Sequence, residues 1–159
     1  IILVGPTCAG KNYIRDKFAQ KDYIIDVSYT SRPPRPGEID GKDYWFISKK
    51  YFQDRIREYD FYEYTQYGDD YYGTGRWEWE TCDVFIMETD GISKIDPEDR
   101  KNCLIIYINT PLDIRIVRMM DRGWDPKKIT ERIEIDNKKF HDFKDYDIQI
   151  SSQSQWERL

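Results

Sequence analysis

The first twelve residues carry a pattern that binds phosphate. Two glycines and a lysine, Gly5, Gly10 and Lys11, stand in the order G-x-x-x-x-G-K directly after the apolar run 1–4. Glycines at these positions let the backbone turn its N–H groups inward around a nucleotide phosphate, and the next helix points its positive end at the same place. Lys11 is then expected to reach the outer phosphates. A tight turn that binds nothing is the alternative, and the apolar strand before the pattern favours phosphate binding.

Two residues of this loop are unusual. The position after the lysine is ordinarily a serine or threonine whose hydroxyl holds Mg²⁺. Here it is Asn12, which offers an amide carbonyl oxygen from a longer reach. Cys8 lies beside a helix N-terminus, where a thiol can become sensitive to oxidation. A small space-filling side chain is the simpler interpretation of Cys8.

A second anion site is indicated by residues 28–46. Prolines at positions 33, 34 and 36 remove backbone donors and keep this stretch extended, so it cannot form a regular helix. It can instead hold Arg32 and Arg35 on a stiff support. Two forked guanidinium groups and a phenol such as Tyr44 could then surround one phosphate. A solvated basic loop is the alternative.

These residues resemble the signature of the guanylate kinase family. The matching positions are Thr30, Ser31, Arg32, Arg35, Glu38, Gly41, Tyr44 and Phe46. The resemblance covers most of the chain and implies an α/β, P-loop three-layer fold with a mainly parallel core sheet, an α+β insertion that binds GMP, and a helical lid. It implies one domain, with the core at residues 1–27, 82–119 and 138–159, the insertion at 28–81 and the lid at 120–137.

The same resemblance implies how guanine is recognised. Glu63 would accept hydrogen bonds from the N1–H and the 2-amino group, Thr74 would face O6, and Tyr72 would join Tyr44 at the GMP phosphate. The chemistry is sound because a carboxylate only accepts hydrogen bonds, whereas adenine presents an acceptor at N1 and would leave the buried charge unpaired. The full expected GMP-binding set is Ser28, Arg32, Arg35, Tyr44, Glu63, Tyr72, Thr74 and Glu88.

The metal site expected of this family is altered. Aligned on Gly91, Glu88 takes the place of the second acid of the family's Asp-x-Asp segment, and Ile86 replaces the first. Glu88 is therefore expected to order Mg²⁺-bound water or the guanine amino group. With Asn12, the loss of the first acid weakens the metal site, so Mg²⁺ would be held mainly by ATP oxygens and water, or the enzyme would be slow.

Arginines after residue 110 resemble the lid of the family. Arg122 and Arg132 are expected to close over the ATP phosphates and Arg118 to stack near adenine, while Arg115 is as well explained as a surface cation. The expected ATP-binding set is Gly5, Pro6, Thr7, Cys8, Ala9, Gly10, Lys11, Asn12 and Arg118. The expected catalytic set is Lys11, Arg35, Arg122 and Arg132.

The resemblance implies transfer of the ATP γ-phosphoryl group to GMP with Mg²⁺ as cofactor. No general base is needed because the acceptor phosphate is already anionic, so catalysis consists of positioning and neutralising charge. Two alternatives stay open. One is a guanylate-kinase-like binding module that has lost catalysis, and the other is a kinase of the same fold with another acceptor, such as dGMP or a sugar phosphate.

Composition limits the partners of the chain. Its 159 residues suit one domain, and a net charge of −5 argues against binding to duplex nucleic acid or to a membrane surface. No apolar run approaches the length that spans a bilayer. Three widely spaced cysteines indicate a reducing, cytoplasmic setting. A monomer and a homodimer are equally compatible with the sequence, and the single histidine, His141, lies outside every phosphate segment.

Alternating strands and helices must position these residues. We expect a helix at 12–20 after the loop and strands at 23–27, 83–88, 104–109 and 146–150. This alternation predicts an open, mainly parallel sheet, whose ligands bind beyond the carboxyl ends of the strands.

Caps and turns predict the other elements. Ser48 is expected to cap a helix at 48–59, with Phe52, Ile56 and Tyr59 on one face. Residues 60–74 are expected to form β-structure with a turn, 75–81 a shortened connection and 95–101 a polar connection. Thr110 is expected to cap a helix with Pro111 at its first position, and Asp125–Pro126 to cap another that runs to Phe143. From Ser151 we expect a polar tail that begins a helix.

Overall fold

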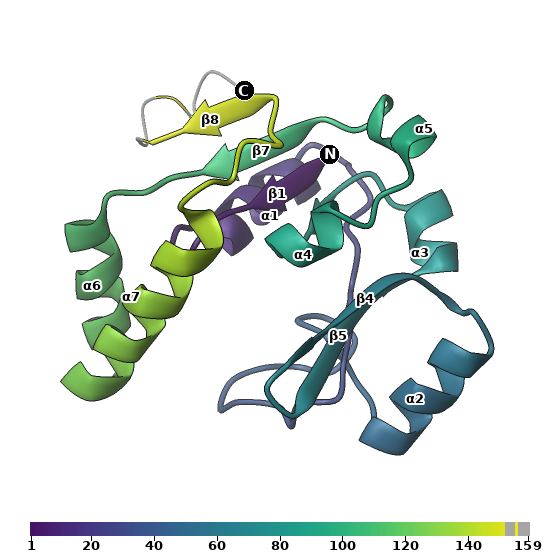
Figure 1. The fold of residues 1–159 in the computed structure, drawn as a ribbon, viewed down its shortest axis with the longest axis horizontal. Coiled ribbons are helices and arrows are strands. Elements are labelled where there is room, and N and C mark those ends of the chain that lie inside the picture. Colours follow the sequence, from purple (N-terminus) through teal and green to yellow (C-terminus); the bar gives the residue numbers. More distant parts are fainter. Residues whose placement is uncertain (152–154, 156–159) are drawn as a thin grey trace.

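Two sheets form the framework of the molecule (Figure 1), whose computed structural model describes residues 1–151 and 155. The first sheet has four parallel strands in the order β6-β1-β7-β8. They are β1 (Ile2–Val4), β6 (Phe85–Ile86), β7 (Ile105–Ile108) and β8 (Ile148–Ile150). The expected parallel core sheet is therefore present.

The second sheet comes from the middle of the chain. Its order is β3-β2-β5-β4, with β2 parallel to β3 and the other pairs antiparallel. The strands are β2 (Tyr29–Thr30), β3 (Trp45–Phe46), β4 (Phe61–Tyr67) and β5 (Asp70–Gly75). In Figure 1 the long β4–β5 hairpin projects away from the parallel sheet, on the side opposite β8.

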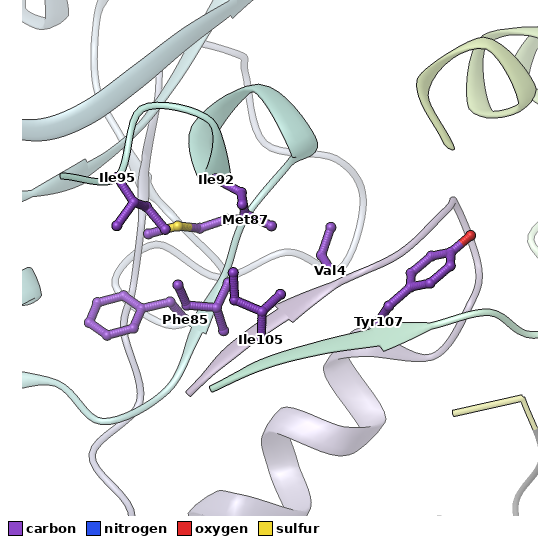
Figure 2. Close-up of a cluster of buried hydrophobic side chains, with 8 residues drawn as sticks. Val4, Phe85, Met87, Ile92, Ile95, Ile105 and Tyr107 are labelled. Atoms are coloured by element: carbon purple, nitrogen blue, oxygen red, sulfur yellow. The ribbon is translucent and has the colours of Figure 1, made fainter. Parts of the chain in front are cut away.

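Uninterrupted apolar runs place the parallel strands in the core. Every residue of β1 and β7 is buried, as expected for strands covered on both faces. Because side chains alternate along a strand, Val4 and Ile105 join Phe85, Met87 and others on one face of the sheet (Figure 2), while the residues between them pack on the other face. This rigid sheet fixes where each strand ends, and therefore where its functional residues begin.

Helices join and cover the two sheets. The first four are α1 (Lys11–Ala19), α2 (Lys49–Arg57), α3 (Arg76–Thr81) and α4 (Thr89–Ile92). They are followed by α5 (Pro97–Arg100), α6 (Leu112–Asp121) and α7 (Pro126–Phe140). Ser48 accepts from the N–H of Tyr51 and Asp125 from that of Lys128, which confirms both predicted caps. No helix of the described chain is long and apolar enough to cross a membrane.

Several predicted elements differ from the structure. The strand expected at 23–27 is a single bridge between Ile25 and Val84, because Tyr23 and Ile24 lie exposed at an edge. Segment 75–81 contains a helix, α3, rather than a plain connection, and segment 95–101 contains α5, capped by Asp96.

The predicted ends of two helices were also wrong. The helix that begins at Lys49 ends at Arg57, so Tyr59 adopts a φ of 59° and is 78% exposed instead of continuing the apolar face. The last helix ends at Phe140 and not at Phe143. Most of the tail expected to begin a helix after Ser151 lies outside the described residues.

Candidate active site

The loop between β1 and α1 presses against β7. A Cβ on Gly5 would lie 2.4 Å from the carbonyl oxygen of Ile108, so only glycine fits there, and Gly10 has a φ of 106°. The ammonium of Lys11 donates to the carbonyl oxygens of Gly5 and Pro6, at 3.1 Å for Pro6. Burial lowers the pKa of Lys11, an effect that the charge of Glu88 opposes.

Residues on α6 and just before it donate hydrogen bonds to the backbone of the loop. Thr110 does not cap the helix as predicted, because Pro111 takes the cap position and the Thr110 hydroxyl donates to the Ala9 carbonyl oxygen at 2.6 Å. Arg118 donates to the carbonyl oxygen of Cys8 at 2.9 Å. Cys8 itself is buried, with a φ of 60°.

One cavity of about 760 Å³ collects most of the predicted site residues. Gly5, Pro6 and Thr74 are the predicted residues that do not line it. The predicted residues that do line it are Thr7, Cys8, Ala9, Gly10, Lys11, Asn12, Ser28, Arg32, Arg35, Tyr44, Glu63, Tyr72, Glu88, Arg118, Arg122 and Arg132. We refer to the part of the cavity beside the loop as the ATP end and to the part beside the second sheet as the acceptor end, after the ligands that the sequence leads us to expect there.

A buried arginine forms the floor of the acceptor end. Both terminal nitrogens of Arg32 bind Glu38, at 2.8 and 2.9 Å, and its guanidinium lies 5.6 Å from the ring centroids of Tyr44 and Phe46. The Arg35 side chain makes no hydrogen bond or ion pair with another described residue and is exposed at the cavity. A rigid guanidinium and a free one therefore share this end.

A carboxylate at the same end pairs with a threonine across two strands. Glu63 on β4 stands opposite Thr74 on β5, and the Thr74 hydroxyl donates to Glu63 Oε1 at 3.0 Å. Burial raises the pKa of Glu63, although the Thr74 hydroxyl and the charge of Lys94 oppose this. The second oxygen, Oε2, lies so close to Gly91 that a Cβ there would meet it at 2.9 Å. The geometry leaves Glu63 able to accept N–H groups from a ligand.

An unpredicted acid, Asp26, also lines the acceptor end. It is 8% exposed, accepts from the Ser28 hydroxyl at 2.6 Å, and its other oxygen has no partner among the described residues. Burial raises the pKa of Asp26 to about 7, helped by the charges of Glu78 and Glu63. No phosphate or metal pattern in the sequence marks this residue.

Glu88 lies at the ATP end, where β6 gives way to α4. Its carboxylate pairs with Lys139 of α7 at 2.9 Å. Burial acts to raise the pKa of Glu88, but the charges of Lys11 and Lys139 hold it below its usual value. The negative charge of Glu88 is thus balanced by Lys139. The described residues also contain no group of three or more His, Cys, Asp or Glu side chains able to hold a metal ion, so the site does not fit an Mg²⁺ ion coordinated by protein groups alone.

A second unpredicted acid, Asp136 of α7, ties the loop to the helices behind it. It is 1% exposed and accepts from the Thr7 backbone N–H at 2.9 Å and the Thr7 hydroxyl at 3.2 Å. It also pairs with Arg115 at 3.2 Å and Arg132 at 3.1 Å. Arg115 is thus a buried partner of Asp136 and not a surface cation. One signal could have found Asp136, which interrupts the apolar stripe of its helix four residues after Arg132.

The predicted lid arginines differ in their surroundings. Arg132 binds Asp136, donates to the hydroxyl of Thr7, and donates to the Tyr67 hydroxyl at 3.2 Å. Arg122 follows the last turn of α6 and is exposed at the cavity. Arg132 is therefore held against the loop, whereas the side chain of Arg122 is exposed and makes no hydrogen bond or ion pair with another described residue.

The glycine-containing loop lies at the carboxyl end of β1, an inner strand of the parallel sheet, and leads directly into helix α1. This arrangement defines a P-loop nucleotide-binding protein of the α/β class. The sequence profile described as "Guanylate kinase" matches residues 1–157. The chain belongs to the guanylate kinase family, as the sequence predicted.

Individual relatives agree with this assignment. The chain is 46% identical over 143 residues to a guanylate kinase of Lactiplantibacillus plantarum, a match that covers 83% of this chain and 68% of the relative. It is 33% identical to guanylate kinases of Thermus thermophilus, covering 84% and 64%, and of Streptococcus agalactiae, covering 94% and 77%. The crystal structure of guanylate kinase from Anaplasma phagocytophilum has the same fold, with a TM-score of 0.75 at 18% identity over 99% of this chain and 80% of that one.

Proposed function

We propose that this chain transfers the γ-phosphoryl group of ATP to GMP, giving ADP and GDP. The observation that supports the proposal most is that the P-loop and Glu63 line one cavity, which Arg32 and Arg35 also line. Thr74 does not line the cavity but orients Glu63 through its hydroxyl. A triphosphate and a purine monophosphate can therefore meet there. The family of the chain and the names of its relatives support the same activity.

Each end of the cavity has its proposed role. The loop from Gly5 to Asn12, with Lys11, would hold the ATP phosphates, and Arg118 would lie near adenine. At the acceptor end Arg32, Arg35, Tyr44 and Tyr72 would hold the GMP phosphate, while Ser28, Glu63 and Thr74 would bind the base. Arg122 and Arg132 would close over the transferring group and exclude water. We keep residues 28–81 as the proposed GMP-binding insertion and 120–137 as the proposed lid.

Mg²⁺ is part of the proposal in a restricted form. Glu88 is paired with Lys139, and Asn12 offers at most one amide oxygen. The ion would therefore arrive on the ATP phosphates and keep its waters, as Mg²⁺ commonly does. We further propose a cytoplasmic protein, monomeric or homodimeric, that acts on ATP and GMP without nucleic-acid or membrane partners.

An assay that couples ADP release to a measurable signal tests this function. GMP, dGMP, AMP, CMP and UMP would be compared as acceptors with ATP and Mg²⁺. We expect turnover with GMP, and at least a hundredfold lower kcat/KM with AMP, because adenine leaves the buried Glu63 without donors. Turnover with another acceptor in preference to guanine nucleotides would contradict the proposal, and binding of GMP without turnover would indicate a binding module.

A further inference from the structure

Lys139 is a cation of the cavity that no motif predicts. It lies on α7, seven residues after Arg132 and three after Asp136, so all three share the side of the helix that meets the loop. Its side chain is only 17% exposed and lines the cavity. The neighbouring Lys138 is exposed to solvent. The two lysines therefore differ in burial although they are adjacent on one helix.

The Lys139 ammonium lies where three parts of the molecule meet. It donates to Glu88, at the end of β6, over 2.9 Å. It also lies 4.9 Å from the ring centroid of Tyr67, the last residue of β4 in the second sheet. An ammonium has three N–H donors. Within the described part of the chain Glu88 is its only hydrogen-bond acceptor, which leaves donors for a ligand in the cavity.

The charge around Glu88 shows what such a ligand must be. Glu88 carries one negative charge, and the positive charges of Lys11, Lys139 and Arg132 all act on it. Asp136, which pairs with Arg132, adds a second negative charge, so this corner of the cavity has three positive charges against two negative ones without any bound ligand. A group with several anionic oxygens would be attracted there, and the phosphoryl group that passes between the loop and the acceptor end is such a group.

We propose that Lys139 is a catalytic residue whose ammonium binds an oxygen of the transferring phosphoryl group. The inference rests on the proposed function and deepens it. In that reaction the bond from the γ-phosphorus to the β–γ bridging oxygen breaks, its electron pair leaves with ADP, and a GMP phosphate oxygen forms the new bond. Lys139 transfers no proton. Its fixed positive charge stabilises the negative charge on the oxygens of the transferring phosphoryl group. The Glu88 carboxylate in this corner is already paired with Lys139 and is not free to bind a metal.

A purely structural role is the competing explanation. The Lys139–Glu88 pair joins α7 to the start of α4, and such a pair could serve only to hold the helix in place. The two explanations differ in what they predict. A structural pair changes the melting temperature and the Michaelis constants, whereas a phosphoryl contact changes kcat with little effect on either.

Three variants separate these explanations in the ADP-release assay with GMP. Lys139→Met removes the charge and keeps much of the side-chain length, Lys139→Arg keeps the charge, and Lys138→Met is the matched control on the same helix. We expect Lys139→Met to lower kcat about a hundredfold, with KM for ATP and for GMP within threefold of wild type. Lys139→Arg should recover kcat to within tenfold of wild type, and Lys138→Met should stay within twofold.

The double variant Glu88→Gln/Lys139→Met gives a second measurement, together with the melting temperatures of all variants. A structural pair predicts that removing both charges restores kcat, because neither partner is then left unpaired. A phosphoryl contact predicts that the double variant is at least as slow as Lys139→Met. Restored turnover in the double variant, or a Lys139→Met kcat equal to that of Lys138→Met, overturns the inference alone. Wild-type chain that binds ATP but does not turn over GMP overturns the proposed function, and the inference with it.

Discussion

Three carboxylates that line the cavity, Asp26, Glu63 and Glu88, have oppositely shifted pKa values at its two ends. At the acceptor end burial raises the pKa of Asp26 to about 7 and also raises that of Glu63, and neither acid has an ion-pair partner among the described residues. At the ATP end burial acts in the same direction on Glu88, but Lys11 and Lys139 outweigh it and lower the pKa. The difference teaches that one end is suited to neutral N–H donors and the other to phosphate charge.

The largest effect is expected from the substitution that removes the Lys11 charge at the ATP end. Lys11→Ala should reduce kcat/KM with ATP and GMP by about 10³-fold or more, because Lys11 is the one cationic side chain of the loop 5–12 and it lines the cavity. Arg35→Ala should do the same at the acceptor end. Lys21→Ala, an exposed lysine just after α1, is the control and should leave kcat/KM unchanged. Retained turnover in Lys11→Ala, with an unchanged melting temperature, would sink the assigned role.

The next effect concerns how the ATP end is held together. Asp136→Ala should lower the free energy of unfolding by about 3–5 kcal/mol, because Arg115 would be left buried without a counter-charge. Urea denaturation measures this loss. The control Asp142→Ala, at an exposed position, should change stability by less than about 0.5 kcal/mol. Replacing both partners, as Arg115→Met/Asp136→Leu, should recover much of the loss, and a loss below about 1 kcal/mol in Asp136→Ala would contradict the network.

A smaller effect tests the protonated state of the acceptor end. Because the pKa of Asp26 is raised from 3.8 to about 7, the folded chain binds more protons than the unfolded chain between these values. The contribution of Asp26 to stability is therefore present at low pH and is lost as pH rises towards 7. Between pH 5 and pH 8 the wild type should lose about 2–3 kcal/mol relative to Asp26→Asn, at about 1.36 kcal/mol per pH unit below the folded pKa. Parallel pH–stability curves for the two proteins would show that Asp26 is ionised when folded.

The smallest of these effects tests base reading. Glu63→Gln replaces one acceptor oxygen with an NH₂ group and should lower kcat/KM for GMP about thirtyfold, or about 2 kcal/mol. KM for ATP should not change, because Glu63 belongs to the other end. Glu58→Gln, at an exposed site just after α2, is the control. A Glu63→Gln enzyme that keeps wild-type kcat/KM with GMP would remove the proposed difference between the two ends.

The two ends also differ in how far the sequence predicts them. The acceptor end depends on short-range pairs such as Arg32 with Glu38, six residues apart, and Glu63 with Thr74 within one hairpin. Residues so close in sequence form a pattern that can be recognised directly. The P-loop itself was equally local, and so were the caps at Ser48 and Asp125.

Contacts over long sequence separations could not be predicted in this way. Asp136 meets Thr7 across 129 residues, and Lys139 meets Glu88 across 51. Such pairs depend on how α7 packs against the sheet, which helical periodicity alone does not determine. The strand predicted at 23–27 was wrong for a related reason. Its apolar residues indicate a strand, but its neighbours in space determine how many of them form β-pairs.

The tip of the β4–β5 hairpin has a consequence for how this chain can vary. A surface turn containing glycine, as at Gly68, is ordinarily a place where insertions are accepted. Here the residue before it, Tyr67, receives the Arg132 guanidinium and the Lys139 ammonium from α7. Residues inserted before Tyr67 would carry the phenol past both cations, so the length of β4 is set by a helix more than sixty positions further along the chain.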